Sequence, residues 1–370
     1  MCSSDLDFKF RHTKMEWRGV PVVAANMDTT GTFEIAKALQ KNEMLTCLQK
    51  FYSVKEIRSA LKKGINPNNI AITSGSTDES LELLKKKMKL DNGLKFICLD
   101  VANGYREDFL QFVRKVRKQF KDKIIIAGNI ATREMSEALI LAGADIVKVG
   151  IGPGSVCTTR KVAGVGYPQL SAISECADAA HGLGGHVMSD GGCNSPGDVS
   201  KAFAAGADFV MLGGMFAGHD ESGGELMTSK EGTPYKTFYG MSSAKAMKTY
   251  FGEVAKHRAP EGKEVRVPYR GPVEITVQSI LGGIRSACSY VGARRIKDLP
   301  KCTTFVRVTI TTNETNLLPN HVSINDSVSS CRGLFCGGAH LTALAILTPY
   351  SSSPSSIDTA SLEEGGRRGG

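Results

Sequence analysis

Eight short apolar runs recur along the chain, and longer stretches with helical spacing separate them. The runs lie at residues 20–25, 44–48, 70–73, 96–99, 124–127, 146–149, 187–189 and 209–212. Nearly all are continuous rather than alternating, which is typical of parallel strands that are covered on both faces. Eight such strands with intervening helices predict an α/β fold, the (β/α)8 TIM barrel, with its active site at the carboxyl ends of the strands.

An internal echo supports a repeated unit. Residues 142–150 and 205–213 agree at six of nine positions, and both begin with Ala-Gly-Ala-Asp. In each copy a glycine is placed to end a helix just before an apolar run begins. We therefore expect the two segments to occupy equivalent places in the barrel.

Two long insertions and a change of composition define the domain organisation. Residues 150–167, after the sixth strand, predict a catalytic loop, and residues 215–268, after the eighth, predict a glycine-rich and charged lid. A tolerated surface excursion is the alternative for the second insertion. We expect residues 1–309 to form the catalytic barrel domain. Residues 310–370 are of low complexity and predict a disordered tail without chemistry.

The charge and the cysteines limit the partners and the compartment. The formal charge is +9, which favours an anionic partner such as a nucleotide phosphate. The run of Lys85, Lys86, Lys87 and Lys89 predicts a solvated helix face, because no aromatic residues interleave for base stacking. Ten cysteines without a C-x-x-C pair, and no apolar leader, predict a reduced cytoplasmic protein. We expect neither nucleic acid nor a membrane as a partner.

The first insertion contains the candidate nucleophile. Residues 150–161 read Gly-Ile-Gly-Pro-Gly-Ser-Val-Cys-Thr-Thr-Arg-Lys, a spacing that does not fit the dinucleotide-binding fingerprint. Its glycines allow main-chain groups to approach an ion or a phosphate closely. A thiol becomes a useful nucleophile beside cationic neighbours, and Arg160 and Lys161 closely follow Cys157. By contrast, Cys47, Cys98 and Cys176 fall in predicted strands or helices and are expected in the core.

Polar residues and glycines follow most of the eight runs, as a ligand-binding rim requires. They include Asn26, Asp28, Lys50, Ser74, Gly75, Asp100, Gly128, Asn129 and Asp190. The pairs Gly191-Gly192 and Gly213-Gly214 follow the seventh and eighth strands, where many barrels bind phosphate through loop amides. Asp190 could accept hydrogen bonds from a ribose diol, or it could cap the following turn.

Together these motifs resemble the IMP dehydrogenase and GMP reductase family over nearly all of residues 16–308. The resemblance rests on the loop string with Asp190-Gly191-Gly192, Gly213-Gly214 and the Tyr-Gly-Met-Ser of residues 239–242. Residues 26–29, 100–104, 164–170 and 258–262 are similar to the reductase branch, and the chain lacks a regulatory insertion after the second strand. The resemblance implies reductive deamination of GMP to IMP and ammonia with NADPH, in purine nucleotide interconversion, through a thioimidate on Cys157.

The same resemblance implies a role for individual residues. Catalysis is assigned to Cys157, Thr159 and Glu261. Binding of GMP is assigned to Ser155, Asp190, Gly191, Gly192, Gly213, Gly214, Gly240, Met241, Ser242, Arg258, Ala259, Pro260 and Gly262. Binding of NADPH is assigned to Lys50, Asp100, Val101, Ala102, Ile151, Gly152, Met241, His257, Arg258, Ser286 and Tyr290, the last two reaching a neighbour's cofactor in a homotetramer. A potassium ion is assigned to Gly152, Gly154, Cys157 and Arg160.

Two departures from the family pattern leave alternatives open. The family carries a further segment before the stretch that matches residues 5–19, and this segment supplies part of the cofactor contacts. We therefore expect a truncated or alternative product, and the alternative is a catalytically weak isoform that binds nucleotide. IMP dehydrogenase activity is the other alternative, opposed by the absence of an Arg-Tyr pair in the lid. The substrate that is turned over discriminates these readings.

Overall fold

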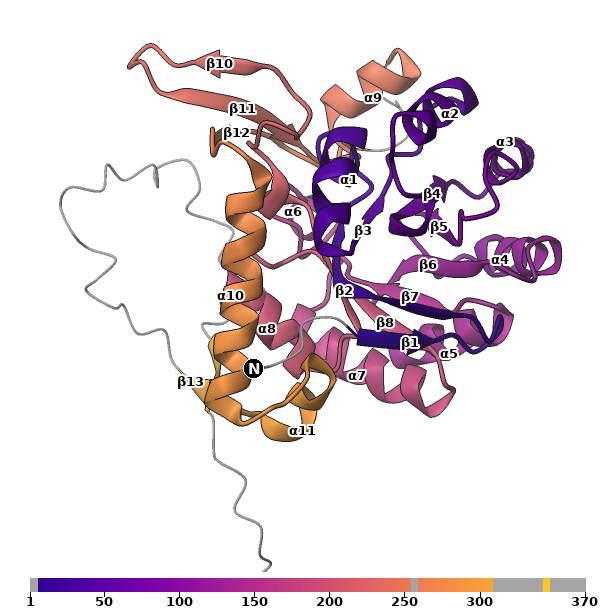
Figure 1. Ribbon diagram of the computed structural model, residues 1–370, viewed down its shortest axis with the longest axis vertical. Helices are drawn as coiled ribbons and strands as arrows, with labels where there is room; N and C mark the ends of the chain where they lie inside the picture. The colour runs from indigo at the N-terminus through magenta and orange to yellow at the C-terminus, as the bar shows by residue number, and fades with distance from the viewer. Residues whose placement is uncertain (1–5, 254–258, 309–341, 347–370) are drawn as a thin grey trace, which may run out of the picture.

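The computed structural model of the chain describes residues 6–253, 259–308 and 342–346. Eight parallel strands form a closed barrel in which the last strand pairs with the first (Figure 1). They are β2 (Glu16–Ala24), β3 (Met44–Cys47), β4 (Ile70–Ser74), β5 (Phe96–Asp100), β6 (Ile124–Ile130), β7 (Ile146–Val149), β8 (His186–Asp190) and β9 (Phe209–Leu212). Each predicted run falls on one of these strands, so the predicted TIM barrel is confirmed.

One long helix follows each barrel strand and covers the outside of the barrel (Figure 1). The helices are α1 (Phe33–Leu39), α2 (Val54–Lys62), α3 (Asp78–Met88), α4 (Glu107–Gln119), α5 (Arg133–Ala142), α7 (Gln169–Gly182), α8 (Pro196–Ala204) and α10 (Val273–Val291). Local sequence explains where they begin. For example, Ser195 and Asp198 form a capping box at the start of α8, with Pro196 in its first turn.

The internal echo has a structural reason. Asp145 stands just before β7 and its Oδ2 accepts from the amide of Ile125 at 3.0 Å. Asp208 stands just before β9 and its Oδ2 accepts from the amide of Val187 at 2.8 Å. Glycines with φ of +119° and +107° precede the two aspartates, at residues 143 and 206. Each copy thus ends a helix and ties the start of one strand to the strand before it.

A short strand that the sequence analysis did not predict closes the amino end of the barrel. This strand, β1 (Leu6–Lys9), pairs antiparallel with the start of β2 and places Phe8 opposite Trp17. The rings of Phe8 and Phe209 stack with centroids 4.4 Å apart, and Trp17 meets Phe96 edge-on at 5.6 Å. Four residues are too few for a periodicity signal. The aromatic layer fills the barrel floor opposite the catalytic rim.

Two histidines share one carboxylate beside this floor. His181 Nε2 lies 2.7 Å from Asp208 Oδ2, and His186 Nδ1 lies 3.3 Å from Asp208 Oδ1. The Asp208 carboxylate raises the pKa of His181. Burial opposes protonation of His186, but the same carboxylate outweighs burial and raises its pKa.

We expect this cluster to make stability depend on pH. A histidine whose pKa is raised on folding contributes stability below its ordinary value of about 6.5, and the contribution is lost as pH rises through the raised pKa. Thermal unfolding should therefore show a higher Tm at about pH 6 than at about pH 8.5. Asp208→Asn should remove about 1 kcal/mol at the lower pH and flatten the difference. An unchanged pH dependence in that variant would assign the effect to other groups.

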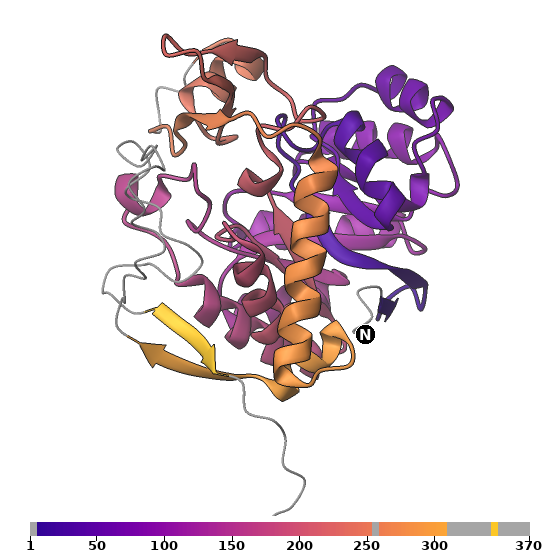
Figure 2. The ribbon, with the colours of Figure 1, turned by 60° about the vertical axis from the view of Figure 1, so that its left-hand side comes forward.

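The predicted lid contains regular structure above the carboxyl end of the barrel (Figures 1 and 2). A three-stranded antiparallel sheet is formed by β10 (Leu226–Thr228), β11 (Pro234–Tyr239) and β12 (Glu264–Pro268), and α9 (Ala244–Phe251) lies between the last two strands in sequence. Lys236 of β11 fixes the root of the sheet, because its Nζ donates to the carbonyls of His219 and Ser222 at 2.8 and 2.9 Å.

The chain leaves the barrel through α10, which runs from the lid end to the opposite end of the molecule (Figure 2). There α11 (Leu299–Cys302) leads to β13 (Thr304–Val308), which pairs antiparallel with β14 (Thr342–Ile346). The predicted tail, residues 310–370, therefore contributes one strand, while its other residues lie outside those described. Its disorder and the domain boundary at residue 309 stay predictions. No helix among the described residues combines the length and apolarity needed to span a membrane.

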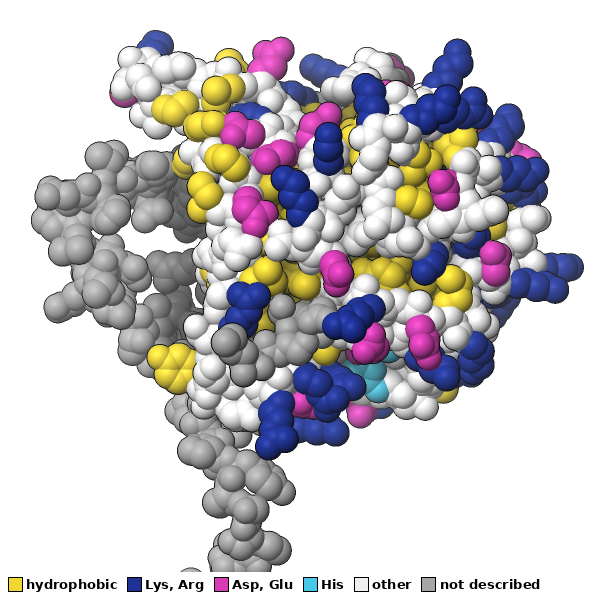
Figure 3. Space-filling view, in the orientation of Figure 1, with side chains coloured by type: hydrophobic (Ala, Val, Ile, Leu, Met, Phe, Trp, Pro, Cys, Tyr) yellow, Lys and Arg dark blue, Asp and Glu magenta, His cyan; other side chains and the backbone are white. Residues whose placement is uncertain are grey.

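One expectation about the surface is wrong. Lysines and arginines gather over α2, α3 and α4 on the face shown in Figure 3, and Lys86 and Lys89 are exposed as predicted. Lys87 is instead buried, and its Nζ donates to the carbonyl of Lys50 at 3.1 Å. Burial lowers the pKa of Lys87 to about 8. Its methylene stem follows the inner face of α3 beside Leu84, which the run of like charges concealed.

Candidate active site

A hydrogen-bonded chain of three side chains marks the chemical centre. The thiol of Cys157 donates to the hydroxyl of Thr159 at 3.2 Å, and that hydroxyl donates to Glu261 Oε2 at 2.6 Å. Cys157 and Thr159 come from the loop after β7, where Thr159 begins the short helix α6 (Thr159–Val162). Glu261 comes from the lid, just before β12. The structure thus brings together the three residues to which catalysis is assigned.

Main-chain hydrogen bonds hold the lid against the catalytic loop. The amide of Thr158 donates to the carbonyl of Glu261 at 2.9 Å, and the amide of Lys263 donates to the carbonyl of Val156 at 2.9 Å. Gly262 forms a bridge with Cys157 between these two bonds. A Cβ on Gly262 would meet the amide nitrogen of Ser243 at 2.9 Å, so the close packing of this segment on residues 240–243 of the lid requires glycine there.

The glycine pairs predicted to hold phosphate converge on the same loop. A Cβ on Gly191, which follows β8, would lie 3.2 Å from the amide nitrogen of Gly154. A Cβ on Gly214, which follows β9, would lie 3.0 Å from the hydroxyl oxygen of Ser155. The structure therefore gathers loops from three strands around residues 154 and 155.

Below this rim, one lysine joins two carboxylates that the sequence analysis had placed on opposite ligands. Lys148 of β7 donates to Asp100 Oδ1 at 2.6 Å and to Asp190 Oδ2 at 2.9 Å. Burial opposes protonation of Lys148, yet the two carboxylates outweigh it and raise the pKa of the ammonium. Burial alone would raise the pKa of Asp100, but the neighbouring lysines hold it below its ordinary value.

Asn129 completes this group from β6. Its Nδ2 donates to Asp190 Oδ2 and to the carbonyl of Gly150, both at 2.8 Å. Its Oδ1 is buried and accepts no hydrogen bond from the part of the chain that the structure describes. A buried acceptor left over beside Asp190 fits a ligand that brings its own donor, such as a carboxamide or a hydroxyl.

A second set of contacts pins the lid to the barrel rim. Asp28 Oδ2 accepts from the hydroxyls of Tyr239 at 2.5 Å and Tyr250 at 2.9 Å. The ring of Tyr250 stacks on Phe51 with centroids 3.6 Å apart. Burial, together with the Asp28 carboxylate, raises the pKa of both tyrosines. Met241 lies beside this latch, because the amide of Asp28 approaches its Sδ at 3.5 Å.

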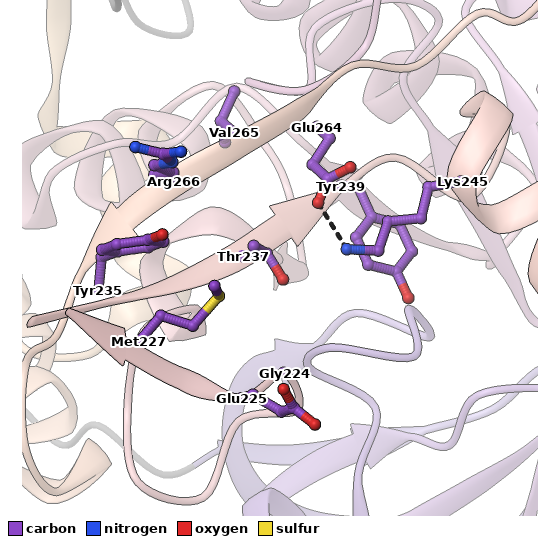
Figure 4. Close-up of a pocket in the computed structure, with 10 residues that line it drawn as sticks. All are labelled: Gly224, Glu225, Met227, Tyr235, Thr237, Tyr239, Lys245, Glu264, Val265 and Arg266. Atoms are coloured by element: carbon purple, nitrogen blue, oxygen red, sulfur yellow. Dashed lines mark hydrogen bonds and ion pairs between the residues drawn. The ribbon is translucent and has the colours of Figure 1, made fainter. Parts of the chain in front are cut away.

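The lid also lines a hollow of about 710 Å³ (Figure 4). Its lining residues are Gly224, Glu225, Met227, Tyr235, Thr237, Tyr239, Lys245, Glu264, Val265 and Arg266. Side chains alternate along β11, so Tyr235 and Tyr239 face the hollow while Phe238 faces the barrel. The Phe238 ring would lie 3.7 Å from a Cβ on Gly213. The hollow reaches the latch, because Tyr239, which lines it, also donates to Asp28 Oδ2.

Some residues assigned by the resemblance are not brought to this centre. Ser286 and Tyr290 lie on the exposed side of α10, about 20 Å or more along the helix from its start near the rim. Tyr290 is 74% exposed, so neither residue serves this chain's own site. His257 and Arg258 lie outside the described residues. Ala259 and Pro260 lead directly into Glu261.

The glycine loop was also assigned a monovalent cation. Residues 150–161 contain no carboxylate, so the loop offers main-chain carbonyl oxygens, which suit a monovalent ion better than a divalent one. Gly152 packs against Arg160, since a Cβ there would meet the arginine Cγ at 2.8 Å. No cluster of metal-ligating His, Cys, Asp or Glu side chains occurs among the described residues. The donor chemistry of the loop is thus compatible with potassium.

Lys148 and Tyr250 are the site residues that sequence reasoning missed. Lys148 did carry a signal, because it is the one charged residue in the apolar run 146–149. Burial of a lysine inside a barrel strand requires a partner, and partners imply a polar group at the strand ends. Tyr250 carried no such signal, because its role depends on how the lid folds back onto Asp28.

Comparison with known proteins agrees with this geometry. The family profile described as IMP dehydrogenase / GMP reductase domain matches residues 1–316. The chain is 60% identical over 313 residues to a GMP reductase of Caenorhabditis elegans, covering 84% of this chain and 87% of the relative. It is 59% identical over 305 residues to GMP reductase 2 of Homo sapiens, covering 82% and 87%. It is 57% identical over 303 residues to a GMP reductase of Escherichia coli O81 (strain ED1a), covering 81% and 87%.

Proposed function

Because this chain belongs to the IMP dehydrogenase and GMP reductase family, we propose that it converts GMP to IMP and ammonia by NADPH-dependent reductive deamination. The observation that carries the proposal is the chain of hydrogen bonds from Cys157 through Thr159 to Glu261. A nucleophile, a hydroxyl and a carboxylate in that order can attack a carbon and deliver a proton to its leaving group.

In the first step the Cys157 sulfur bonds to C2 of the purine. The thiol proton, passed through Thr159 and Glu261, goes to the amino substituent, and the C2–N bond breaks to release ammonia. The product of this step is a thioimidate between Cys157 and the purine. Thr159 holds its proton directed at Glu261, so the relay is oriented before substrate binds.

When bound, NADPH supplies the hydride that reduces C2. In that step the Cys157 sulfur leaves as a thiolate when the C–S bond breaks, and IMP is released. The described residues proposed to line the cofactor side in this chain are Lys50, Asp100, Val101, Ala102, Ile151, Gly152 and Met241. Asn129 Oδ1, a buried acceptor beside Asp190, supports a ligand that brings its own donor to this group.

Substrate position is attributed to the rim. Asp190, at the end of β8, would accept from the ribose diol, and the main chain at Gly191, Gly192, Gly213 and Gly214 would hold the phosphate near Ser155. From the lid, Gly240, Met241, Ser242 and the segment 258–262 would cover the base. The main-chain bonds between segments 156–158 and 261–263 support a covered site from which water is excluded.

The proposal includes finer features of the family. A potassium ion on the carbonyls of Gly152, Gly154, Cys157 and Arg160 would order the loop that carries the nucleophile. A homotetramer would use the exposed side of α10, where Ile275 and Tyr290 are 64% and 74% exposed. We place the protein in the cytoplasm, with catalysis in residues 1–309 and none in residues 310–370.

Loss of NADPH absorbance with the purified chain and GMP tests this function. We expect turnover with GMP and none when IMP and NAD are supplied instead. Turnover with IMP and NAD alone would reassign the chain to the dehydrogenase branch. Binding of GMP without consumption of NADPH would favour the catalytically weak isoform.

A further inference from the structure

We propose that Lys148 is a positioning residue that couples the GMP-side carboxylate of Asp190 to the NADPH-side carboxylate of Asp100. The inference rests on the proposed function, because that function assigns the two carboxylates to their ligands. The placement of Lys148 itself comes from the structure. It touches neither the nucleophile nor the proton relay.

The geometry places the lysine beneath the two carboxylates. Only 3% of the Lys148 side chain is exposed, while Asp100 and Asp190 are 25% and 21% exposed. Lys148 points into the barrel from β7, and its partners stand at the ends of β5 and β8. The carboxylates therefore present oxygen atoms to the open end of the barrel while one buried ammonium holds them from below.

The charges explain why the position requires a cation. Two carboxylate oxygens bonded to the same nitrogen lie within about 6 Å of each other, a distance at which like charges repel strongly in a buried site. Asn129 supplies a second donor to Asp190, but it carries no charge. Without Lys148 the two carboxylates would separate, or one would take up a proton. Separation removes an acceptor from the ribose-binding position, whereas a proton shared by the two carboxylates relieves the repulsion and lets both stay in place.

Other titratable groups face the same cluster. Lys50, after β3, acts on Asp100 from the rim. The thiols of Cys47 on β3 and Cys98 on β5 are close enough to Lys148 to interact with it electrostatically, and the hydrogen bond to Cys98, together with burial, raises the pKa of Cys47. Thiols and ammonium groups keep their charge state in mildly acidic solution. Any pH dependence that appears there on loss of Lys148 is therefore that of the carboxylate pair.

Binding of GMP by isothermal titration calorimetry tests the proposal without relying on turnover. Lys148→Met should raise the Kd for GMP about tenfold or more at about pH 7.5. The ratio of the variant's Kd to that of wild type should be smaller at about pH 5.5. Using the ratio cancels the titration of the GMP phosphate. Lys148→Arg should recover part of the loss. In an Asp190→Asn background, Lys148→Met should add little, because the lysine acts through that carboxylate.

Kinetics should show the coupling to the second ligand. We expect Lys148→Met to raise the KM for both GMP and NADPH by similar factors, with a smaller change in kcat. Arg117→Met is a matched control, because Arg117 pairs with buried Asp145 at 2.5 Å away from the rim. That variant should lose thermal stability to a comparable extent and bind GMP as wild type does.

Two results would overturn the proposal. One is a Lys148→Met protein that is destabilised like Arg117→Met but binds GMP normally at every pH. The other is a full additional loss when Lys148→Met is combined with Asp190→Asn. A wild-type chain that binds GMP without turnover would overturn the proposed function and leave the coupling standing. A wild-type chain that binds no GMP would overturn both.

Discussion

Cys157→Ala is expected to lower kcat for GMP by about 10⁴-fold or more, because no other group can form the bond to C2. The next side chain in the relay, Thr159, is a hydroxyl whose proton is already donated to Glu261 at 2.6 Å. An un-ionised hydroxyl is a far weaker nucleophile than a thiol, so Thr159 does not replace Cys157. GMP affinity should change little, since the proposed phosphate and ribose contacts come from other residues. Steady-state kinetics and calorimetry with GMP measure the two effects separately.

The control for this variant is Cys302→Ala. Cys302 is also a partly exposed thiol, but it belongs to α11 at the far end of the molecule. The Cys302→Ala variant should turn over GMP as wild type does. Alkylation gives an independent check. An alkylating reagent should modify Cys157, while the buried thiols of Cys47 and Cys98 should resist it. Bound GMP should protect Cys157 from the reagent. More than a tenth of wild-type activity in Cys157→Ala would rule out the covalent mechanism.

Glu261→Gln is expected to lower kcat by about 10² to 10⁴-fold, the usual range for loss of a group that moves a proton. The amide keeps the size of the side chain but can no longer take a proton from Thr159. Thr159→Val should cost a similar factor because it breaks the same relay. The double variant should be little worse than either single one, since both changes remove one function.

A second lid carboxylate provides the matched control for Glu261→Gln. Glu264 lies three residues further on, pairs with Lys245 at 2.5 Å and lines the hollow of the lid (Figure 4). Glu264→Gln should leave kcat within about twofold of wild type. Equal losses in the two variants would mean that lid charge, rather than the relay, sets the rate. Additive losses for Thr159→Val and Glu261→Gln would mean that they act independently.

The fold could be predicted because its signal is local and repeated. Each barrel strand is an apolar run with a helix after it, and the echo at Asp145 and Asp208 marks the joint between units. β1 was not predicted because four residues carry little periodicity, although the sequence does show the aromatic residues Phe8 and Trp17. The strands of the lid sheet were not predicted for a different reason. Its strands are short, partly exposed and paired across intervening glycines, so local sequence favours a loop.

The site residues likewise divide into those that local sequence and topology predict and those that only tertiary contacts bring together. Cys157, Asp190 and the glycine pairs follow strands directly, so the barrel topology alone places them on one rim. The resemblance supplied Glu261, because nothing local distinguishes it from any solvated lid carboxylate. The tie between Asp100 and Asp190 depends on one side chain from β7 reaching two other strands. Contacts of that kind arise from barrel closure and have no spacing rule in the sequence.

The junction between lid and loop has a consequence for how such an enzyme can diverge. It is made of amide and carbonyl groups of residues 156, 158, 261 and 263, so it does not depend on most of the side chains there. The exception is Gly262, where a Cβ would lie 2.9 Å from the amide nitrogen of Ser243. Mutation can therefore change the character of the lid surface while the backbone register of the proton relay stays the same. Sequence differences between branches that run different reactions should accumulate on the lid around this main-chain seam.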